Sequence, residues 1–128
     1  MGQKFLIDTN VIIDYTSDLL PEKGSAFAEH LFNTDFNISV IVKIEALGYS
    51  GAHDKMKFLE AFLNTATIYT PDNVVTQKTI ELRRIKKIKL GDAIVAATAL
   101  AYDLTLITRN INDFKGIPGL TVIDPYAE

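Results

Sequence analysis

Four acidic residues stand beside strongly apolar stretches of the sequence, where an ordinary surface acid is not expected. Asp8 follows the apolar run 5–7, Glu45 comes shortly after a second run, Asp92 opens an alanine-rich stretch, and Asp113 follows a third run. A carboxylate near a protein core costs free energy unless its charge is compensated. Converging carboxylates also raise one another's pKa, so a cluster of them is stable at neutral pH mainly around a divalent cation.

Oxygen ligands of this type suit Mg²⁺ or Mn²⁺. The chemistry that pairs such an ion with acids is attack of an activated water on a phosphodiester, in which the ion stabilises the attacking and leaving oxygens. Asp8 by itself has a simpler interpretation as a helix N-cap, a position that Asp often fills. The three further acids in comparable positions make the cap interpretation insufficient for Asp8.

The elements that must position these acids alternate along the chain. Short apolar runs predict strands at residues 5–7, 38–42, 66–70, 105–108 and 120–123. Helices are predicted at residues 11–15, from residue 25 onward after a break at 20–24, and at 44–47, 54–64, 72–85 and 91–101. This alternation predicts a parallel sheet in a layered α/β sandwich, whose ligands bind beyond the carboxyl ends of the strands.

The stretch 91–101 is apolar around its whole circumference, so it is expected to be a buried central helix. The stripe of Phe27, Leu31 and Phe32 is either core or a groove for the helix of a partner protein, and the core is favoured. His30 and His53 are expected on the surface rather than among metal ligands.

Length and composition set bounds on the class of protein. A chain of 128 residues, 48% hydrophobic and 23% charged, is expected to fold as one domain. The absence of cysteine fits a reducing compartment, with the cytoplasm as the default. No segment reaches the ~20 apolar residues of a membrane span, and no signal-peptide pattern is present.

The charge pattern excludes one class of nucleic-acid protein and leaves another open. A net charge of -3 argues against a protein that coats nucleic acid through a general positive field. A nuclease is not excluded, because acids gathered around a metal ion account for part of that charge. The basic run 83–89 has two interpretations: it complements a helix dipole, or one or two of its side chains contact phosphates.

Four segments together resemble the four sequence blocks of the PIN domain. The sequence is most similar to the VapC-type toxin ribonucleases of prokaryotic type II toxin–antitoxin pairs. The resemblance covers nearly the whole chain and implies a single PIN-like domain over residues 1–128, a three-layer α/β/α sandwich with a central parallel sheet. The segments that carry it are residues 7–10, 39–47, 91–99 and 108–114.

The resemblance implies an endoribonuclease that depends on Mg²⁺ or Mn²⁺ and cuts single-stranded RNA. It also implies a homodimer held inactive by a cognate antitoxin protein. Carried onto this chain, it makes catalytic and metal-site acids of Asp8, Glu45, Asp92 and Asp113, with Asn110 as a substitute or helper in the fourth position. The supporting residues that it implies are Thr9, Asn10, Thr108 and Asn110.

Two other classes of function are weighed against this one. A PIN-like module could bind RNA or a protein without cutting, which would make RNA binding insensitive to metal. A receiver or phosphatase-like domain would use Asp8 as a phosphoacceptor and needs a partner lysine at a later strand end. The strand ends offer Asn10 and Asp113 instead, so this third class is disfavoured.

Overall fold

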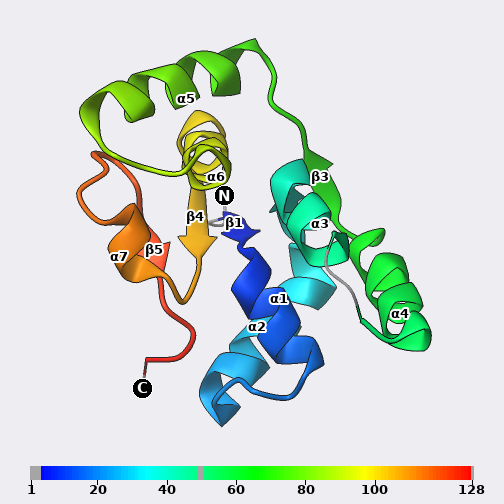
Figure 1. Ribbon diagram of the computed structural model, residues 1–128. Helices are drawn as coiled ribbons and strands as arrows, with labels where there is room; N and C mark the ends of the chain where they lie inside the picture. The colour runs from blue at the N-terminus through cyan, green and yellow to red at the C-terminus, as the bar shows by residue number, and fades with distance from the viewer. Residues whose placement is uncertain (1–3, 49–50, 128) are drawn as a thin grey trace.

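The structure, a computed structural model, describes residues 4–48 and 51–127 and centres on parallel strands (Figure 1). One sheet has the order β1-β4-β5, formed by Lys4–Ile7, Leu104–Ile107 and Val122–Ile123. A second pairs β2 with β3, formed by Asn37–Ser39 and Thr67–Tyr69. Every pairing is parallel, which confirms the predicted α/β class with a parallel sheet.

Side chains join the two sheets where β2 lies beside β1. The Phe5 N–H donates to Asp35 Oδ2 at 2.9 Å, and Asn37 Nδ2 donates to the Phe5 carbonyl oxygen at 2.9 Å. Asn37 Nδ2 also donates to Asp35 Oδ1 at 2.8 Å. Because Asn37 is only 5% exposed, its amide supplies a donor to the Phe5 carbonyl oxygen where water has little access.

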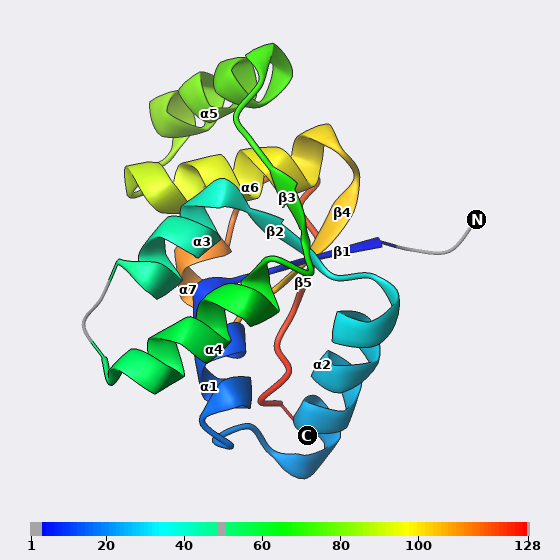
Figure 2. The same cartoon turned by 90° about the vertical axis from the view of Figure 1, so that its right-hand side faces the viewer.

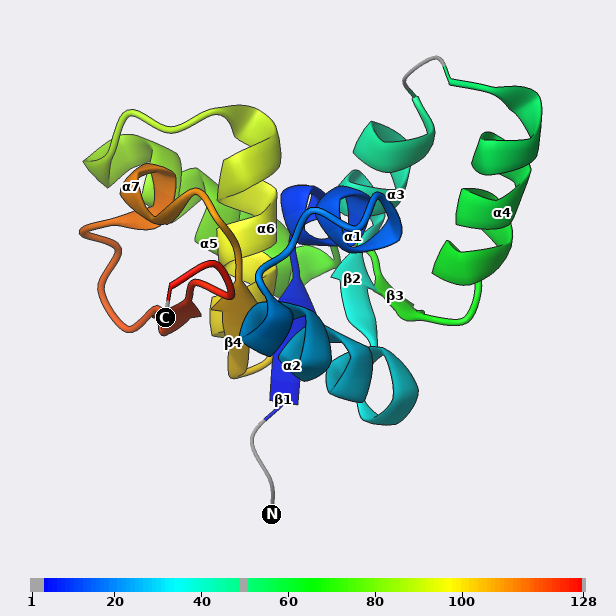
Figure 3. The ribbon, with the colours of Figure 1, turned by 90° about the horizontal axis from the view of Figure 1, so that it is seen from below.

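Helices cover both faces of the strands. In Figure 2, α5 and α6 lie above the strands and α2 lies below them, and Figure 3 shows α1 and α2 from the underside. Residues Ala93 and Val95–Ala99 of α6 are buried, which confirms the predicted central helix. The helices of the described residues are α1 Thr9–Thr16, α2 Glu22–Thr34, α3 Val40–Leu47, α4 His53–Leu63, α5 Asn73–Ile85, α6 Leu90–Ala101 and α7 Ile111–Phe114.

The prediction of a strand over residues 38–42 is wrong in its second half. β2 ends at Ser39, and Val40 begins α3. Ser39 is the N-cap of α3, since its Oγ accepts the Ile41 N–H at 3.1 Å. The cap therefore overrides the β-propensity of the following apolar residues, and Glu45 lies in the second turn of a helix.

Other boundaries also differ from the sequence predictions. The predicted break at residues 20–24 is wrong from Glu22 onward, because α2 begins there and contains Gly24. A Cβ at Gly24 would lie 1.8 Å from the Pro125 carbonyl oxygen, so glycine there admits the C-terminal segment rather than breaking a helix. The segment after β4 is not only a loop but includes the one-turn helix α7. Strands β3, β4 and β5 are each shifted or shorter than predicted.

The aromatic stripe of α2 belongs to the core, as favoured from the sequence. The Phe32 ring packs edge-on against Tyr15, Phe36 and Phe62, with centroid distances of 4.7, 4.9 and 5.0 Å. His30 and His53 are exposed, as predicted. No helix in the described ranges is long and apolar enough to cross a membrane.

Replacing Asn37 by alanine tests the junction between β1 and β2. The Phe5 carbonyl then loses its buried donor, so we expect the free energy of unfolding in urea to fall by about 1–3 kcal/mol. The matched control is Asn33→Ala on the exposed side of α2, which should change the free energy of unfolding by less than about 0.5 kcal/mol. Equal effects of the two variants would contradict a structural role for the Asn37 amide.

Candidate active site

The pairing of β1 with β4 brings Asp8 and Thr108 together. Ile7 and Ile107 are partners in the parallel register, and each is followed by one of the two polar residues. The Asp8 N–H donates to the Ile107 carbonyl oxygen at 2.9 Å. Thr108 Oγ1 donates to Asp8 Oδ2 at 2.8 Å, although the two residues lie 100 positions apart. The carboxyl ends of two adjacent strands therefore meet at Asp8, as predicted for a ligand site.

Asp8 is both a helix cap and a buried acid. Its Oδ1 accepts the Thr9 N–H at 2.9 Å at the start of α1, and its Oδ2 also accepts from Asn10 Nδ2 at 3.3 Å. Burial raises its pKa, against the hydrogen bonds from Thr108 and Thr9, which lower it, and the charge of Glu45 raises it further. Since Asp8 is only 5% exposed, its orientation is fixed by these donors.

The hydroxyl of Thr108 and the amide of Asn10 form a small network around Asp8. Thr108 Oγ1 accepts the Asn110 N–H at 3.0 Å and also accepts from Asn10 Nδ2 at 3.3 Å. Asn10 Oδ1 accepts the Arg109 N–H at 3.0 Å. Asn10 and Thr108 thus support Asp8 through their side chains, whereas Asn110 contributes its backbone.

Glu45 reaches the same place from α3. Thr9 Oγ1 donates to Glu45 Oε1 at 2.7 Å. On its other side lies the first turn of α6, because a Cβ at Gly91 would lie 3.6 Å from Glu45 Oε2. Asp92 belongs to that same turn, so the starts of α1 and α6 and the second turn of α3 converge.

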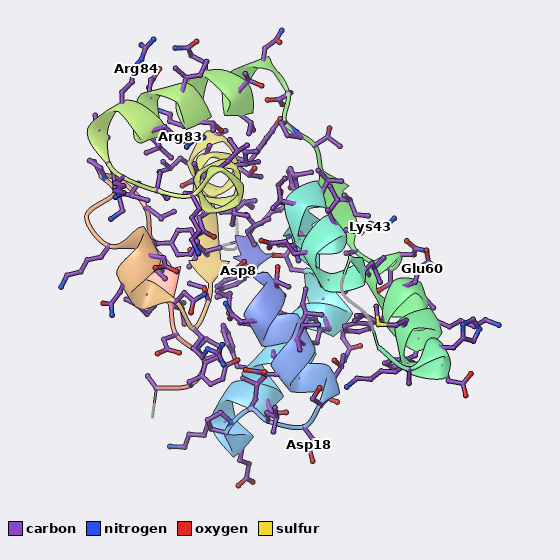
Figure 4. All side chains as sticks on the ribbon, in the orientation of Figure 1. Asp8, Asp18, Lys43, Glu60, Arg83 and Arg84 are labelled. Atoms are coloured by element: carbon purple, nitrogen blue, oxygen red, sulfur yellow. The ribbon has the colours of Figure 1, made fainter. Side chains whose placement is uncertain are left out.

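The pKa of Asp92 responds to the charges of the other three predicted acids. Burial raises the pKa of Asp92 to about 6, with further increases from the charges of Asp8, Asp113 and Glu45, in that order. The charge of Lys89 opposes them and lowers the pKa. Figure 4 shows Asp8 near the middle of the molecule, between the end of β4 and α1.

Asp113 and Asn110 occupy different places in this arrangement. Asp113 is exposed on α7 and lines, together with Asp92, a cleft of about 450 Å³. Asn110 does not line this cleft, and its N–H is directed to Thr108. The geometry therefore favours Asp113 over Asn110 as the fourth acid position.

The carboxylate oxygens of the acids are suitable ligands for a divalent cation, although they do not form a preassembled ligand group in the described residues. Within residues 4–48 and 51–127, no three His, Asp or Glu side chains stand close enough together to form a ready ligand group. Yet the converging donors are all oxygen, and the pKa of Asp92 is raised first by burial and then by the charges of the other acids, both of which a cation would offset. This donor set matches Mg²⁺ or Mn²⁺, which bind few carboxylates directly and keep waters.

A fifth acid carries the same sequence signal and is absent from the predictions. Asp14 lies in the apolar segment of α1 and is 9% exposed. Arg109 Nη1 lies 3.1 Å from Asp14 Oδ2, and the Tyr126 hydroxyl donates to the same oxygen. Arg109 compensates the charge of Asp14, and Tyr126 joins the C-terminal segment to α1 through the same carboxylate. The ion pair with Arg109 distinguishes Asp14 from the four predicted acids.

The chain is similar to known proteins over nearly its whole length. Residues 5–120 match the family described as the PIN domain. A toxin–antitoxin complex from Klebsiella pneumoniae contains a similar chain, 33% identical, with a TM-score of 0.79, covering 98% of this chain and 100% of that one. A comparison of the sequence with curated proteins finds no match.

Two further solved structures are similar over almost their full length. VapBC2 from Rickettsia felis, bound to a DNA fragment from its promoter, is 25% identical with a TM-score of 0.80 and covers 95% of this chain and 98% of that one. DNA-bound VapBC from Salmonella typhimurium is 23% identical with a TM-score of 0.80, covers 97% and 99%, and supports the fold alone.

Replacing Asp92 by asparagine tests the raised pKa of Asp92, which burial and the neighbouring acids produce. The folded state has the higher pKa, so it binds the proton more tightly than the unfolded chain does. The stability from that proton is complete below about pH 4 and is lost as the pH rises through about 6. At about pH 7.5, Asp92→Asn should therefore stabilise the metal-free protein by about 1 kcal/mol, after discounting for solvent screening.

The measurement is the thermal unfolding of each protein in EDTA at about pH 7.5 and at about pH 4. The gain should shrink toward zero at about pH 4, where Asp92 is already protonated. Asp54→Asn is the matched control, because Asp54 is also an acid in the first turn of a helix but is exposed on α4, away from the cluster. A loss of stability in Asp92→Asn at both pH values would contradict the raised pKa of Asp92.

Proposed function

Because the chain belongs to the PIN domain family, we propose that it is an endoribonuclease that hydrolyses RNA phosphodiester bonds with Mg²⁺ or Mn²⁺. The observation that carries the proposal is the coupling of Asp92 to the other three acids at one end of the sheet. A site for a metal-dependent phosphodiester hydrolase needs such a cluster of oxygen ligands in a cleft. The catalytic and metal-site acids of the proposal are Asp8, Glu45, Asp92 and Asp113.

The chain's own residues hold the acids in place before substrate binds. Thr108 and Asn10 fix the Asp8 carboxylate by hydrogen bonds of 2.8 and 3.3 Å, and Thr9 fixes Glu45 at 2.7 Å. Such supports keep ligands in a productive geometry and lower the reorganisation that reaction requires. Thr9, Asn10 and Thr108 are thus positioning residues, as is Asn110 through its backbone.

Hydrolysis at this site joins a water oxygen to phosphorus and breaks the bond from phosphorus to a ribose oxygen, which leaves with a proton. A divalent ion, when bound, supplies positive charge that stabilises the attacking and leaving oxygens. The acids orient the reacting groups, and the open cleft beside Asp92 and Asp113 admits the strand.

The comparisons support a more specific role as the toxin of a toxin–antitoxin pair. A chain 33% identical over 98% of this one comes from a toxin–antitoxin complex, and the 25% identical relative is part of a VapBC complex. In this proposal the protein is a cytoplasmic homodimer whose cleavage of RNA is blocked by a cognate antitoxin protein.

Removal of a metal-site acid should abolish cleavage. We expect Asp8→Asn and Asp92→Asn each to lower the rate of cleavage of a labelled single-stranded RNA with Mn²⁺ by on the order of a hundredfold or more. EDTA should stop the unsubstituted protein, and Asp54→Asn should cleave normally. Full activity of either acid variant would overturn the assignment, and RNA binding without products would favour a non-cleaving module.

Thr108 offers a sharper test of positioning. Thr108→Val removes the hydroxyl that donates to Asp8, so we expect cleavage to fall by about 10–100-fold. Thr108→Ser keeps the hydroxyl and should restore most of the rate. If Thr108→Ser were as impaired as Thr108→Val, retention of the hydroxyl would not restore activity, and positioning through this hydrogen bond would be refuted.

A further inference from the structure

The cations of this chain are concentrated in one short segment. Five of its 13 lysines and arginines fall within seven residues that include the end of α5 and the segment before α6. The chain as a whole is negative, with a net charge of -3. Such a local excess indicates one anionic target rather than a general positive field. The five cations are Arg83, Arg84, Lys86, Lys87 and Lys89.

Stabilisation of a helix terminus accounts for only part of this segment. Arg83 and Arg84 lie in the last turn of α5 and complement its dipole. Lys87 and Lys89 lie beyond the end of the helix, where that effect has faded. Neither ion pair found in the described part of the chain uses any of the five cations. Their charge is therefore available to an outside anion.

Four of these cations and two of the four acids line one cleft. Its volume of about 450 Å³ lies within the usual range of ligand sites. Its lining includes Asn112 of α7 as a neutral hydrogen-bonding group. The charged residues that line it are Arg83, Lys86, Lys87, Lys89, Asp92 and Asp113. The cations thus adjoin the acids without neutralising them by contact.

We infer that this cleft binds the phosphates of the single-stranded RNA segment next to the scissile phosphate, an inference that rests on the proposed function. When one phosphate of an RNA strand lies at the acid cluster, the phosphates on either side of it must lie close by. The cations of the cleft attract those phosphates where the acids alone would repel them. They therefore set the path of the strand across the segment between α5 and α6.

Two adjacent arginines, Arg83 and Arg84, allow binding at the cleft to be distinguished from a general effect of positive charge. Figure 4 shows Arg83 on the side of α5 toward α6, whereas Arg84 points away from the fold. In agreement, Arg83 lines the cleft that contains Asp92, and Arg84 does not. Lys23 lies on α2, at the opposite end of the molecule from α5 (Figure 1).

The test compares two double variants that lose the same charge. Arg83→Gln with Lys87→Gln removes two cleft cations, and Arg84→Gln with Lys23→Gln removes two others. Binding of a fluorescent oligouridylate is measured in EDTA by anisotropy over a range of salt concentrations. The cleft variant should raise Kd about tenfold and reduce the slope of log K against log salt by about 1.4, at about 0.7 per lost phosphate contact. The control should change Kd less than about twofold.

Several results would overturn the inference. Equal losses in the two double variants would assign binding to the general field. Absence of RNA binding by the unsubstituted protein would refute the inferred site. Displacement of the RNA by a polyglutamate peptide as readily as by unlabelled RNA would also refute it, because the cleft would then bind any polyanion. Unchanged unfolding temperatures of both variants would confirm that each remains folded.

The same variants separate this inference from the proposed function. RNA binding that depends on the cleft cations, without cleavage in Mn²⁺, would uphold the cleft and refute hydrolysis. Cleavage with an unchanged KM and salt slope in the cleft variant would uphold hydrolysis and refute the cleft.

Discussion

The parallel pairing of β1 with β4 is the constraint on which the candidate site depends. Because Ile7 and Ile107 are register partners, the residues that follow them emerge side by side, and Thr108 can donate to Asp8. A slip of one residue would turn each side chain of β1 to the opposite face and separate this pair. Buried residues on both strands fix the register, so the packing of the core also sets the position of the carboxylate.

The molecule treats Asp14 and the four candidate acids differently. Asp14 is paired with Arg109 and accepts from Tyr126, so its charge serves to attach the C-terminal segment. Among the described residues, none of Asp8, Glu45, Asp92 and Asp113 forms an ion pair. Burial, followed by the charges of the other three acids, raises the pKa of Asp92. The repulsion among them is a cost to the fold that structure alone does not relieve, and it is the physical basis for inferring a bound divalent ion.

Basic and acidic side chains line the same cleft without forming ion pairs with one another among the described residues. The cleft beside the acids is lined by cations of the segment between α5 and α6, although the chain as a whole is negative. A phosphate strand is a ligand that suits both parts, since a metal ion can neutralise the acids while lysine and arginine contact neighbouring phosphates. Net charge alone therefore says little about whether a protein of this kind acts on nucleic acid.

Apolar periodicity is a local property, so the α/β class and the buried central helix α6 could be predicted from the sequence. Charges beside apolar runs are local as well, and they are what made Asp8, Glu45, Asp92 and Asp113 candidates. The sequence did not determine that Ser39 begins a helix, since a side-chain cap outweighed the β-propensity of the residues after it. Nor does the sequence show that Asp14 is paired with Arg109, or that Asp113 lines the cleft whereas Asn110 does not. Those distinctions rest on contacts between residues distant in sequence, such as Arg109 with Asp14, which only tertiary packing creates.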